Sequence, residues 1–271
     1  MKIIAIGDVH NHIKAAEAIA QKYEDTHKII FTGDYFDDFG DNAEVARKTA
    51  IWLKASLMKP NRIHLLGNHD LSYHTRCESV ENGRVVKMYI CSGYTEAKDG
   101  IITEILGTEE WDKLKLHHFE NGWHFTHAGM CEDWFEHPVL GMTNETILET
   151  IKVLDSNLYN REYSAIIGGA GRCRGGMYWK GGITWHDHQR EAQPVRDIFQ
   201  IYGHTPCYVR GHTPRFTGID EFTDVGGINI CIDCGLSQVL EIHEDGTYNK
   251  IDTDFDNFYQ GKTNKNNLWN S

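Results

Sequence analysis

The chain has 271 residues, of which 40% are hydrophobic and 24% are charged, a composition typical of a soluble globular protein with a sizeable core. No apolar run reaches the length of about 18 residues that a membrane span needs, so no membrane segment is expected. The formal charge of −12 argues against extensive nucleic-acid binding, which requires a basic face. A small phosphorylated substrate stays possible, because bound metal ions would invert the local field.

The N-terminus makes a cytoplasmic location the default expectation. The apolar run that starts at Met1 is too short for a signal peptide and leads directly into Gly7 and Asp8, so it is typical of a buried strand. The seven cysteines have no regular spacing and are expected to be reduced thiols. Cys231 and Cys234 lie in a strand-like run, which favours core packing over a zinc or redox role.

The first part of the chain alternates strands and helices. Strands are predicted over 2–6, 28–32 and 62–66, with helices over 11–23 and 42–58 between them. This order indicates βαβ units and a mainly parallel sheet. Sites in such sheets form at the carboxyl ends of the strands, which is where Asp8, Asp34 and Asn68 fall.

The later part of the chain is less regular. A helix is predicted over 100–115, a strand over 123–126 that leads to His127, and a helix over 144–158. A strand over 197–202 leads to His204, and runs 228–233 and 238–243 read as a hairpin. We expect one domain over residues 1–253 and a loosely packed tail over 254–271, which is rich in Asn, Lys and Gly.

Five short segments end apolar runs with residues that bind metals. They are Gly7-Asp8-Val9-His10, Gly33-Asp34-Tyr35-Phe36-Asp37, Gly67-Asn68-His69-Asp70, His127-Ala128-Gly129 and Gly203-His204-Thr205. Carboxylate and amide oxygens with imidazoles suit a two-metal hydrolytic site, in which Asp34 can bridge both ions. Each residue alone would more often cap a turn, but five such segments in order are hard to explain in that way.

The same segments suggest roles around the ions. Asp8 and His10 are spaced to face one ion, and His127 and His204 would complete the other together with Asn68. A hydroxide that bridges the ions would be the nucleophile. His69 is expected to point to the substrate and protonate the leaving oxygen, with Asp70 holding its charged form.

On these motifs the chain resembles the calcineurin-like metallophosphoesterase superfamily from about residue 1 to 240. Within it, Gly203-His204-Thr205-Pro206 and Ile232-Asp233-Cys234-Gly235 resemble the bacterial and bacteriophage branch of serine/threonine phosphatases. The resemblance implies an α/β (α+β) fold with a central β-sandwich of mixed sheets flanked by helices. It also implies hydrolysis of phosphate esters at a dinuclear centre, with manganese as the expected metal and iron, zinc or nickel as alternatives.

By position, the resemblance assigns ligands to both ions and an acid pair. The first ion would take Asp8, His10 and Asp34, and the second would take Asp34, Asn68, His127 and His204. His69 and Asp70 would be the catalytic acid pair.

One departure from the family concerns the residue that grips phosphate. The phosphatase branch usually has Arg in the place of Asp38, and a carboxylate cannot hold phosphate with a fork of donors. Arg174 is the first candidate to replace that Arg, and Arg172 is the second. Both lie in a glycine-rich stretch, where they could equally be surface arginines.

The other departure concerns the last motif, where Thr205 stands in place of the second His that diesterases often carry. Thr205 therefore favours a phosphomonoesterase, whereas Asp38 keeps open a phosphodiesterase or dinucleoside polyphosphate hydrolase. A binding module without turnover is the third reading, disfavoured because both predicted metal shells are complete. Gly211-His212-Thr213-Pro214 repeats the last motif, so His212 is an alternative to His204, which follows the more convincing strand.

Overall fold

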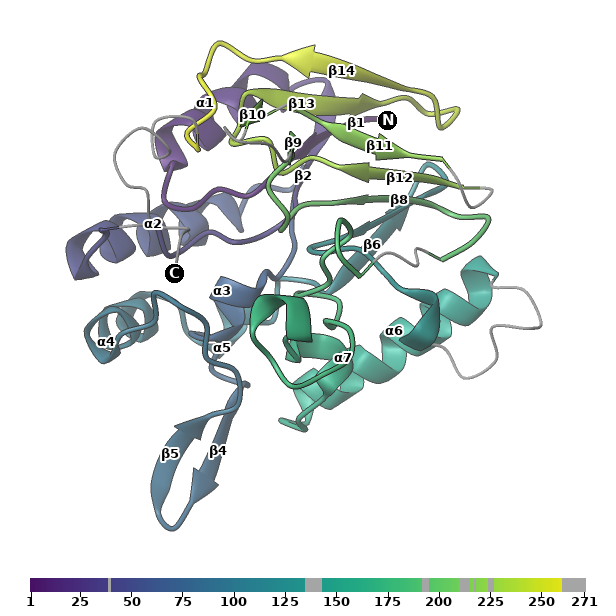
Figure 1. Ribbon diagram of the computed structural model, residues 1–271. Helices are drawn as coiled ribbons and strands as arrows, with labels where there is room; N and C mark the ends of the chain where they lie inside the picture. Colours follow the sequence, from purple (N-terminus) through teal and green to yellow (C-terminus); the bar gives the residue numbers. More distant parts are fainter. Residues whose placement is uncertain are drawn as a thin grey trace.

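Figure 1 shows a computed structural model in which two β-sheets are packed together and flanked by helices. The structure describes residues 1–38, 40–134, 143–191, 195–209, 215–216, 218–223 and 227–259. This arrangement is the mixed-sheet α/β fold that the resemblance implied. Within the described residues, no helix combines the length and apolar character that crossing a membrane would require.

The first sheet contains the predicted βαβ units. Its strand order is β14-β13-β1-β2-β3, in which β1, β2 and β3 are parallel and β13 and β14 are antiparallel additions. Its strands are β1 (Lys2–Ile6), β2 (His27–Phe31), β3 (Arg62–His64), β13 (Gln238–Ile242) and β14 (Tyr248–Asp252). The helices α1 (Ile13–Tyr23) and α2 (Ala43–Ser56) connect the three parallel strands. All five predicted elements of this part are therefore confirmed to within a few residues.

Alternation along β1 explains how this sheet is buried on both faces. Ile4 and Ile6 pack in the cluster that contains the apolar faces of α1 and α2. Ile3 and Ala5 point the other way, into a second cluster that is shared with the second sheet. All four side chains are fully buried, and each isoleucine contributes about 1.5–3 kcal/mol by leaving water.

The second sheet has the order β11-β12-β8-β7-β6 and is also mixed. Its strands are β6 (His117–Glu120), β7 (Trp123–Thr126), β8 (Phe199–Tyr202), β11 (Asp220–Phe222) and β12 (Ile228–Cys231). β7, β8 and β12 are parallel to one another, and β6 and β11 are antiparallel edges. The expected mainly parallel sheet is thus replaced by two mixed sheets, each with three adjacent parallel strands.

The predicted hairpin of 228–233 and 238–243 is wrong. β12 pairs with β8 in the second sheet, whereas β13 pairs with β1 in the first. Ile230 of β12 and Leu240 of β13 instead meet in the cluster between the sheets. Both strands are apolar enough to be buried, and burying them across the sandwich removes more surface than pairing them in one hairpin.

An inserted region follows β3. It contains α3 (Asn68–Leu71), β4 (Glu78–Glu81), β5 (Arg84–Lys87), α4 (Glu96–Ile105) and α5 (Thr108–Trp111). The β4–β5 hairpin projects from the body in Figure 1. The predicted helix over 100–115 is two helices, because Leu106 is extended (φ −105°, ψ 102°) and Gly107 starts α5 with its N–H bonded to the Glu110 carboxylate at 2.9 Å.

The remaining helices lie beside the second sheet. α6 (Asn144–Tyr159) confirms the predicted helix over 144–158 and buries Ile147, Ile151 and Leu154. Short helical turns lie on both sides of α6 in the sequence. The turn η1 (Glu132–Trp134) precedes α6, and α7 (Ala165–Gly168) and η3 (Arg172–Arg174) follow it. The two-stranded pair β9 (Tyr208–Val209) and β10 (Arg215–Phe216) completes the described elements.

The first residues of the expected loose tail are packed. Asn257 is buried, and Phe258 stacks on His12 with ring centroids 4.0 Å apart. The Tyr259 hydroxyl donates a hydrogen bond to Asp233 Oδ1 at 2.8 Å. The structure describes the chain only to Tyr259, and the domain boundary at residue 253 stays a prediction.

Candidate metal centre

The predicted ligands converge at one edge of the sandwich. Asp8 follows β1, Asp34 follows β2, and Asn68 begins α3 after β3. His127 and His204 follow β7 and β8 of the second sheet. These five side chains are all buried. The two sheets therefore contribute to one site through the carboxyl ends of their parallel strands.

The local backbone is shaped for this convergence. His10, Asp34 and His204 have φ angles of 40°, 51° and 68°, a left-handed region that residues other than glycine rarely adopt. A side-chain carbon on Gly67 would overlap the Asp34 carboxylate, and one on Gly203 would overlap that of Asp8. Backbone strain of this kind clusters at functional sites, and here it turns three polar side chains inward.

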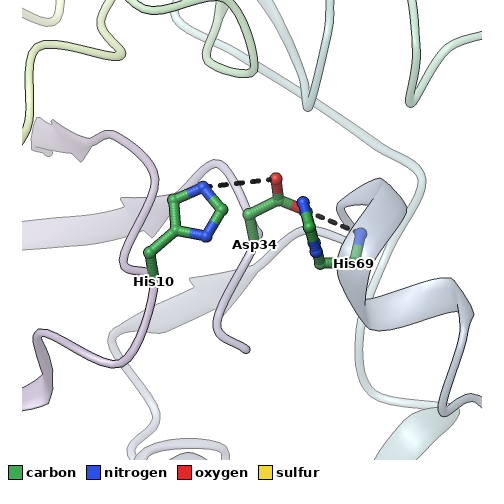
Figure 2. Close-up of side chains that lie close together, drawn as sticks. All are labelled: His10, Asp34 and His69. Carbon is green, nitrogen blue, oxygen red and sulfur yellow. Dashed lines mark hydrogen bonds and ion pairs between the residues drawn. The ribbon is translucent and has the colours of Figure 1, made fainter. Parts of the chain in front are cut away.

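One group of possible ligands consists of His10, Asp34 and His69, whose ligand atoms lie within 4.8 Å of one another. Figure 2 shows the two imidazoles on either side of the Asp34 carboxylate. His10 Nε2 lies 3.7 Å from Asp34 Oδ2 and 3.9 Å from Asp8 Oδ2. His10 is oriented by its Nδ1, which lies 2.8 Å from the Asp37 carbonyl oxygen, so that Nε2 faces the carboxylates.

A second group consists of Asp34, His127 and His204, again with ligand atoms within 4.8 Å. His127 Nδ1 lies 2.8 Å from the Thr32 carbonyl oxygen, which directs Nε2 toward Asp34 Oδ2 at 3.4 Å and Asn68 Oδ1 at 3.0 Å. His204 Nε2 is buried and has no hydrogen-bond partner among the described residues. Asp34 belongs to both groups, which is the position that a bridging carboxylate requires.

The charges at this edge fit divalent cations. Burial and the neighbouring Asp233 carboxylate raise the pKa of Asp8 well above its usual range. Burial lowers the pKa of His127, but Asp34 and Asp8 outweigh burial and raise that pKa to about 9. Burial and Arg174 keep the pKa of His204 well below its usual value, so its ring is neutral. Crowded carboxylates and an unpartnered neutral imidazole nitrogen are the donors that manganese, iron or zinc accept.

The comparisons with known proteins agree with this geometry. A family model described as calcineurin-like phosphoesterase matches residues 1–232. The chain belongs to this family. No curated protein matches the sequence significantly.

Several solved structures resemble this calcineurin-like phosphoesterase over most of its length. A cold-active protein-tyrosine phosphatase of the psychrophile Shewanella sp. is 14% identical with a TM-score of 0.49, over 92% of this chain and 80% of that one. A protein serine/threonine phosphatase from Saccharomyces cerevisiae is 13% identical with a TM-score of 0.46, over 94% and 81%. A metallophosphoesterase from Sphaerobacter thermophilus is 14% identical with a TM-score of 0.44, over 94% and 90%. At these identities the likeness concerns the fold alone.

The predicted pairing of His69 with Asp70 is wrong in this calcineurin-like phosphoesterase. The Asp70 carboxylate accepts hydrogen bonds from the backbone N–H groups of Asp34, Tyr35 and Gly67 at 2.8–2.9 Å. These three backbone donors hold the carboxylate, and within the described residues no hydrogen bond joins it to the His69 ring. Asp70 therefore holds together the two loops that carry Asp34 and Asn68.

Asp37 is the residue that contacts His69. Its Oδ2 lies 3.1 Å from His69 Nδ1, and its Oδ1 accepts hydrogen bonds from Lys98 Nζ at 2.6 Å and Tyr73 Oη at 2.7 Å. Burial lowers the pKa of His69, but the Asp34 and Asp37 carboxylates hold it well above its usual value. A charged imidazole beside the carboxylates can act as an acid toward a leaving oxygen.

Of the two predicted arginines, Arg174 lies beside the ligands. Its Nη2 donates to Thr205 Oγ1 at 3.0 Å, and its Nε lies 3.0 Å from Asp187 Oδ2. Arg172 instead places its guanidinium 5.4 Å from the ring of the exposed Trp179. The structure thus brings Arg174 and not Arg172 next to His204.

Asp38 stands where the family resemblance implies an arginine, and its carboxylate contacts a histidine. Its Oδ2 lies 3.2 Å from His12 Nε2, and the His12 ring stacks on Phe258. Together these side chains form an acidic and aromatic corner near His10.

Several residues contact the centre although the sequence-based assignment gives them no role. Asp37 could have been found, because it follows Asp34 at a fixed spacing in the second motif. Cys91, whose Sγ lies 3.4 Å from His69 Nε2, has no sequence signal, and neither has Lys98. The predicted core role of Cys231 and Cys234 is confirmed, since both are buried free thiols. The alternative ligand His212 lies outside the described residues.

Proposed function

We propose that the chain is a metal-dependent phosphomonoesterase that acts on a phosphoprotein or a small phosphorylated compound, in the cytoplasm. The observation that carries this proposal is that Asp34 Oδ2 lies 3.7 Å from His10 Nε2 and 3.4 Å from His127 Nε2, so that one carboxylate faces an imidazole of each predicted ligand set. A shared carboxylate between two sets of imidazoles is the arrangement that a dinuclear hydrolytic centre needs.

The first ion would be held by Asp8, His10 and Asp34. The second would be held by Asp34, Asn68, His127 and His204. Manganese is the expected metal, since oxygen and imidazole donors in this mixture suit it, and iron, zinc and nickel are the alternatives. When bound, the ions supply Lewis acidity toward the phosphoryl group and lower the pKa of attacking water.

The protein's own residues then act on the substrate. Arg174 is 25% exposed at its side chain and would bind the phosphoryl oxygens through its guanidinium. His69 would donate a proton to the leaving oxygen, oriented by Asp37. The burial of Asp8, Asp34 and His127 would keep bulk water from screening these charges.

A diesterase or dinucleoside polyphosphate hydrolase is the second candidate. It is favoured by Asp38, whose carboxylate lies against His12 and cannot grip a terminal phosphate. A diester carries one charge fewer on the reacting phosphate than a monoester dianion, so it depends less on a second cationic clamp.

The experiment is an assay of the purified full chain, stripped of metal and reconstituted with Mn²⁺. We expect hydrolysis of a mono-aryl phosphate that disappears with chelator, and a lower kcat/KM for a bis-aryl phosphate assayed side by side. Higher activity on the bis-aryl compound would select the second candidate. Full activity of both Asp8→Asn and His69→Asn variants would refute either form of the proposal.

A further inference from the structure

Asp233 is a buried carboxylate that the proposed ligand sets leave without a role. It follows β12 and is fully buried. Its Oδ1 accepts a hydrogen bond from the Tyr259 hydroxyl at 2.8 Å. Its Oδ2 is buried and has no hydrogen-bond partner among the described residues. An ionised carboxylate oxygen in such a place is costly unless a donor or a cation faces it.

The surroundings of Asp233 place it at the metal centre. The carbonyl of the preceding Ile232 and the Cα of Asp233 lie against Gly7, where any side-chain carbon would overlap that carbonyl, so the backbone of Asp233 lies beside the residue that precedes Asp8. The charge of Asp233 acts on Asp8, and the charge of Asp34 acts on Asp233 in turn. Three buried carboxylates are therefore grouped here, and the charge of His127 acts on Asp233 with the opposite sign.

The segment that holds Asp233 comes from the end of the described chain. Phe258 and Tyr259 lie edge-on to the His10 ring, with centroids 6.4 Å and 6.5 Å away. The segment is anchored by the Phe258 N–H, which donates to the Gly235 carbonyl at 3.3 Å. The Tyr259 N–H is bonded to Asn257 Oδ1 at 2.9 Å. The rings of Phe258 and Tyr259 thus cover the side of the centre to which His10 and Asp8 contribute.

We propose that Asp233 is a further carboxylate of the metal centre, serving the first ion through its Oδ2, and that Tyr259 is the positioning residue that fixes it. This inference rests on the proposed function, because it takes the two ions as given. The family match ends at residue 232, before both residues. Tyr259 would hold Oδ1 and so fix the carboxylate, leaving the buried Oδ2 to contact the ion itself or water bound to it.

The test measures metal binding rather than turnover. Apo protein is titrated with Mn²⁺ by isothermal titration calorimetry, and bound manganese is counted after dialysis. We expect wild type to bind two equivalents. Asp233→Asn should keep one of them and bind the other about 100-fold more weakly, and Tyr259→Phe should weaken that same equivalent about tenfold.

Two matched controls separate this effect from a general one. Tyr248 also hydrogen-bonds a carboxylate, that of Glu221, and lies on β14, so Tyr248→Phe removes the same kind of contact elsewhere. Asp112 is paired with Arg76 at the surface, so Asp112→Asn is the control for charge. Both controls should bind manganese as wild type does.

The outcomes distinguish this inference from the proposed function. Wild type that binds two equivalents, with Asp233→Asn and Tyr259→Phe unchanged in both affinities, would overturn the inference and leave the function intact. The contact would then only anchor the segment, which would appear as a lower melting temperature alone. Wild type that binds no manganese would instead refute the proposed function. Should Asp233→Asn not fold, the milder Tyr259→Phe decides.

Discussion

The two sheets give the centre different chemistry. The first sheet supplies oxygen donors from Asp8, Asp34 and Asn68 together with the imidazole of His10, whereas the predicted ligands of the second sheet are the imidazoles of His127 and His204 alone. Asp34 takes part in both His/Asp groups, whereas His127 and His204 take part in only one. Asp34 of the first sheet should therefore control both ions, whereas the imidazoles of the second sheet should control a single ion.

The largest effect is expected when the shared carboxylate is changed. Asp34→Asn should lose both manganese equivalents and reduce kcat/KM at least about 10³-fold, or about 4 kcal/mol of transition-state stabilisation. His204→Asn is the matched change on the second sheet and should lose one equivalent. Manganese counts after dialysis check both variants. Equal losses in the two variants would contradict the asymmetry between the sheets.

The next effect concerns two aspartates of the first sheet's loops. Asp37→Asn should reduce kcat/KM about 10²-fold while both ions stay bound, because Asp37 acts through His69 and not through the metals. The loss should grow as the leaving group becomes more basic, which a series of aryl phosphates measures. Asp70→Asn is the control, since it should lower stability and leave this dependence on the leaving group unchanged. If Asp70→Asn altered the leaving-group dependence and Asp37→Asn did not, the pairing seen here would be wrong.

A smaller effect concerns the response of a buried histidine of the second sheet to acid. In the second sheet, burial lowers the pKa of His117 to about 3, and its Nε2 lies 2.8 Å from His124 Nδ1. The unfolded chain takes up that proton near the usual pKa of 6.5, so stability falls as pH drops below 6.5. The loss is about 2 kcal/mol at pH 5. His117→Gln should lose less between pH 7.5 and pH 5 in urea denaturation, and an unchanged loss would count against this role.

The sequence could predict what depends on neighbouring residues and little of what depends on distant ones. β1, α1, β2, α2 and β3 follow from local periodicity, and the ligands follow from their place after each strand. The pairing of β12 with β8 and not with β13 does not follow from the sequence, because the apolar pattern of a strand does not determine which sheet it joins.

The same limit applies to the site. Asp70 is adjacent to His69 in sequence, which predicts it as the partner of the ring, yet Asp37, 32 positions away, holds the ring. The contact of Tyr259 with Asp233 could not be read from a tail whose composition suggested loose packing. Only the folded chain shows which carboxylate faces which imidazole.

The smallest expected effect is at the outer edge of the first sheet. Arg62 of β3 donates hydrogen bonds to Glu17 of α1 at 2.6 Å and to Glu24 at 2.6 Å. Burial opposes the ionisation of Glu17, but hydrogen bonds from Arg62 and Trp52 lower its pKa to about 2. A lowered pKa means that the ionised form stabilises the fold above the usual pKa of 4.5, and that this contribution disappears as pH falls toward 2.

Because the Glu17 side chain is 26% exposed and solvent partly screens its charge, its contribution is about 1 kcal/mol or less. Glu17→Gln should lower the urea midpoint slightly at pH 7 and have no effect near pH 2. Lys48→Gln is a fitting control, since Lys48 pairs with Glu44 on the exposed face of α2 and should shift the midpoint less. Buried histidines in both sheets, His64 of β3 and His117 of β6, have a pKa lowered to about 3, so the loss of stability from pH 6.5 is common to both sheets and only the loss below pH 4.5 belongs to Glu17. If Glu17→Gln instead changed stability between pH 6.5 and 5, the ionised carboxylate of Glu17 would not be the group responsible.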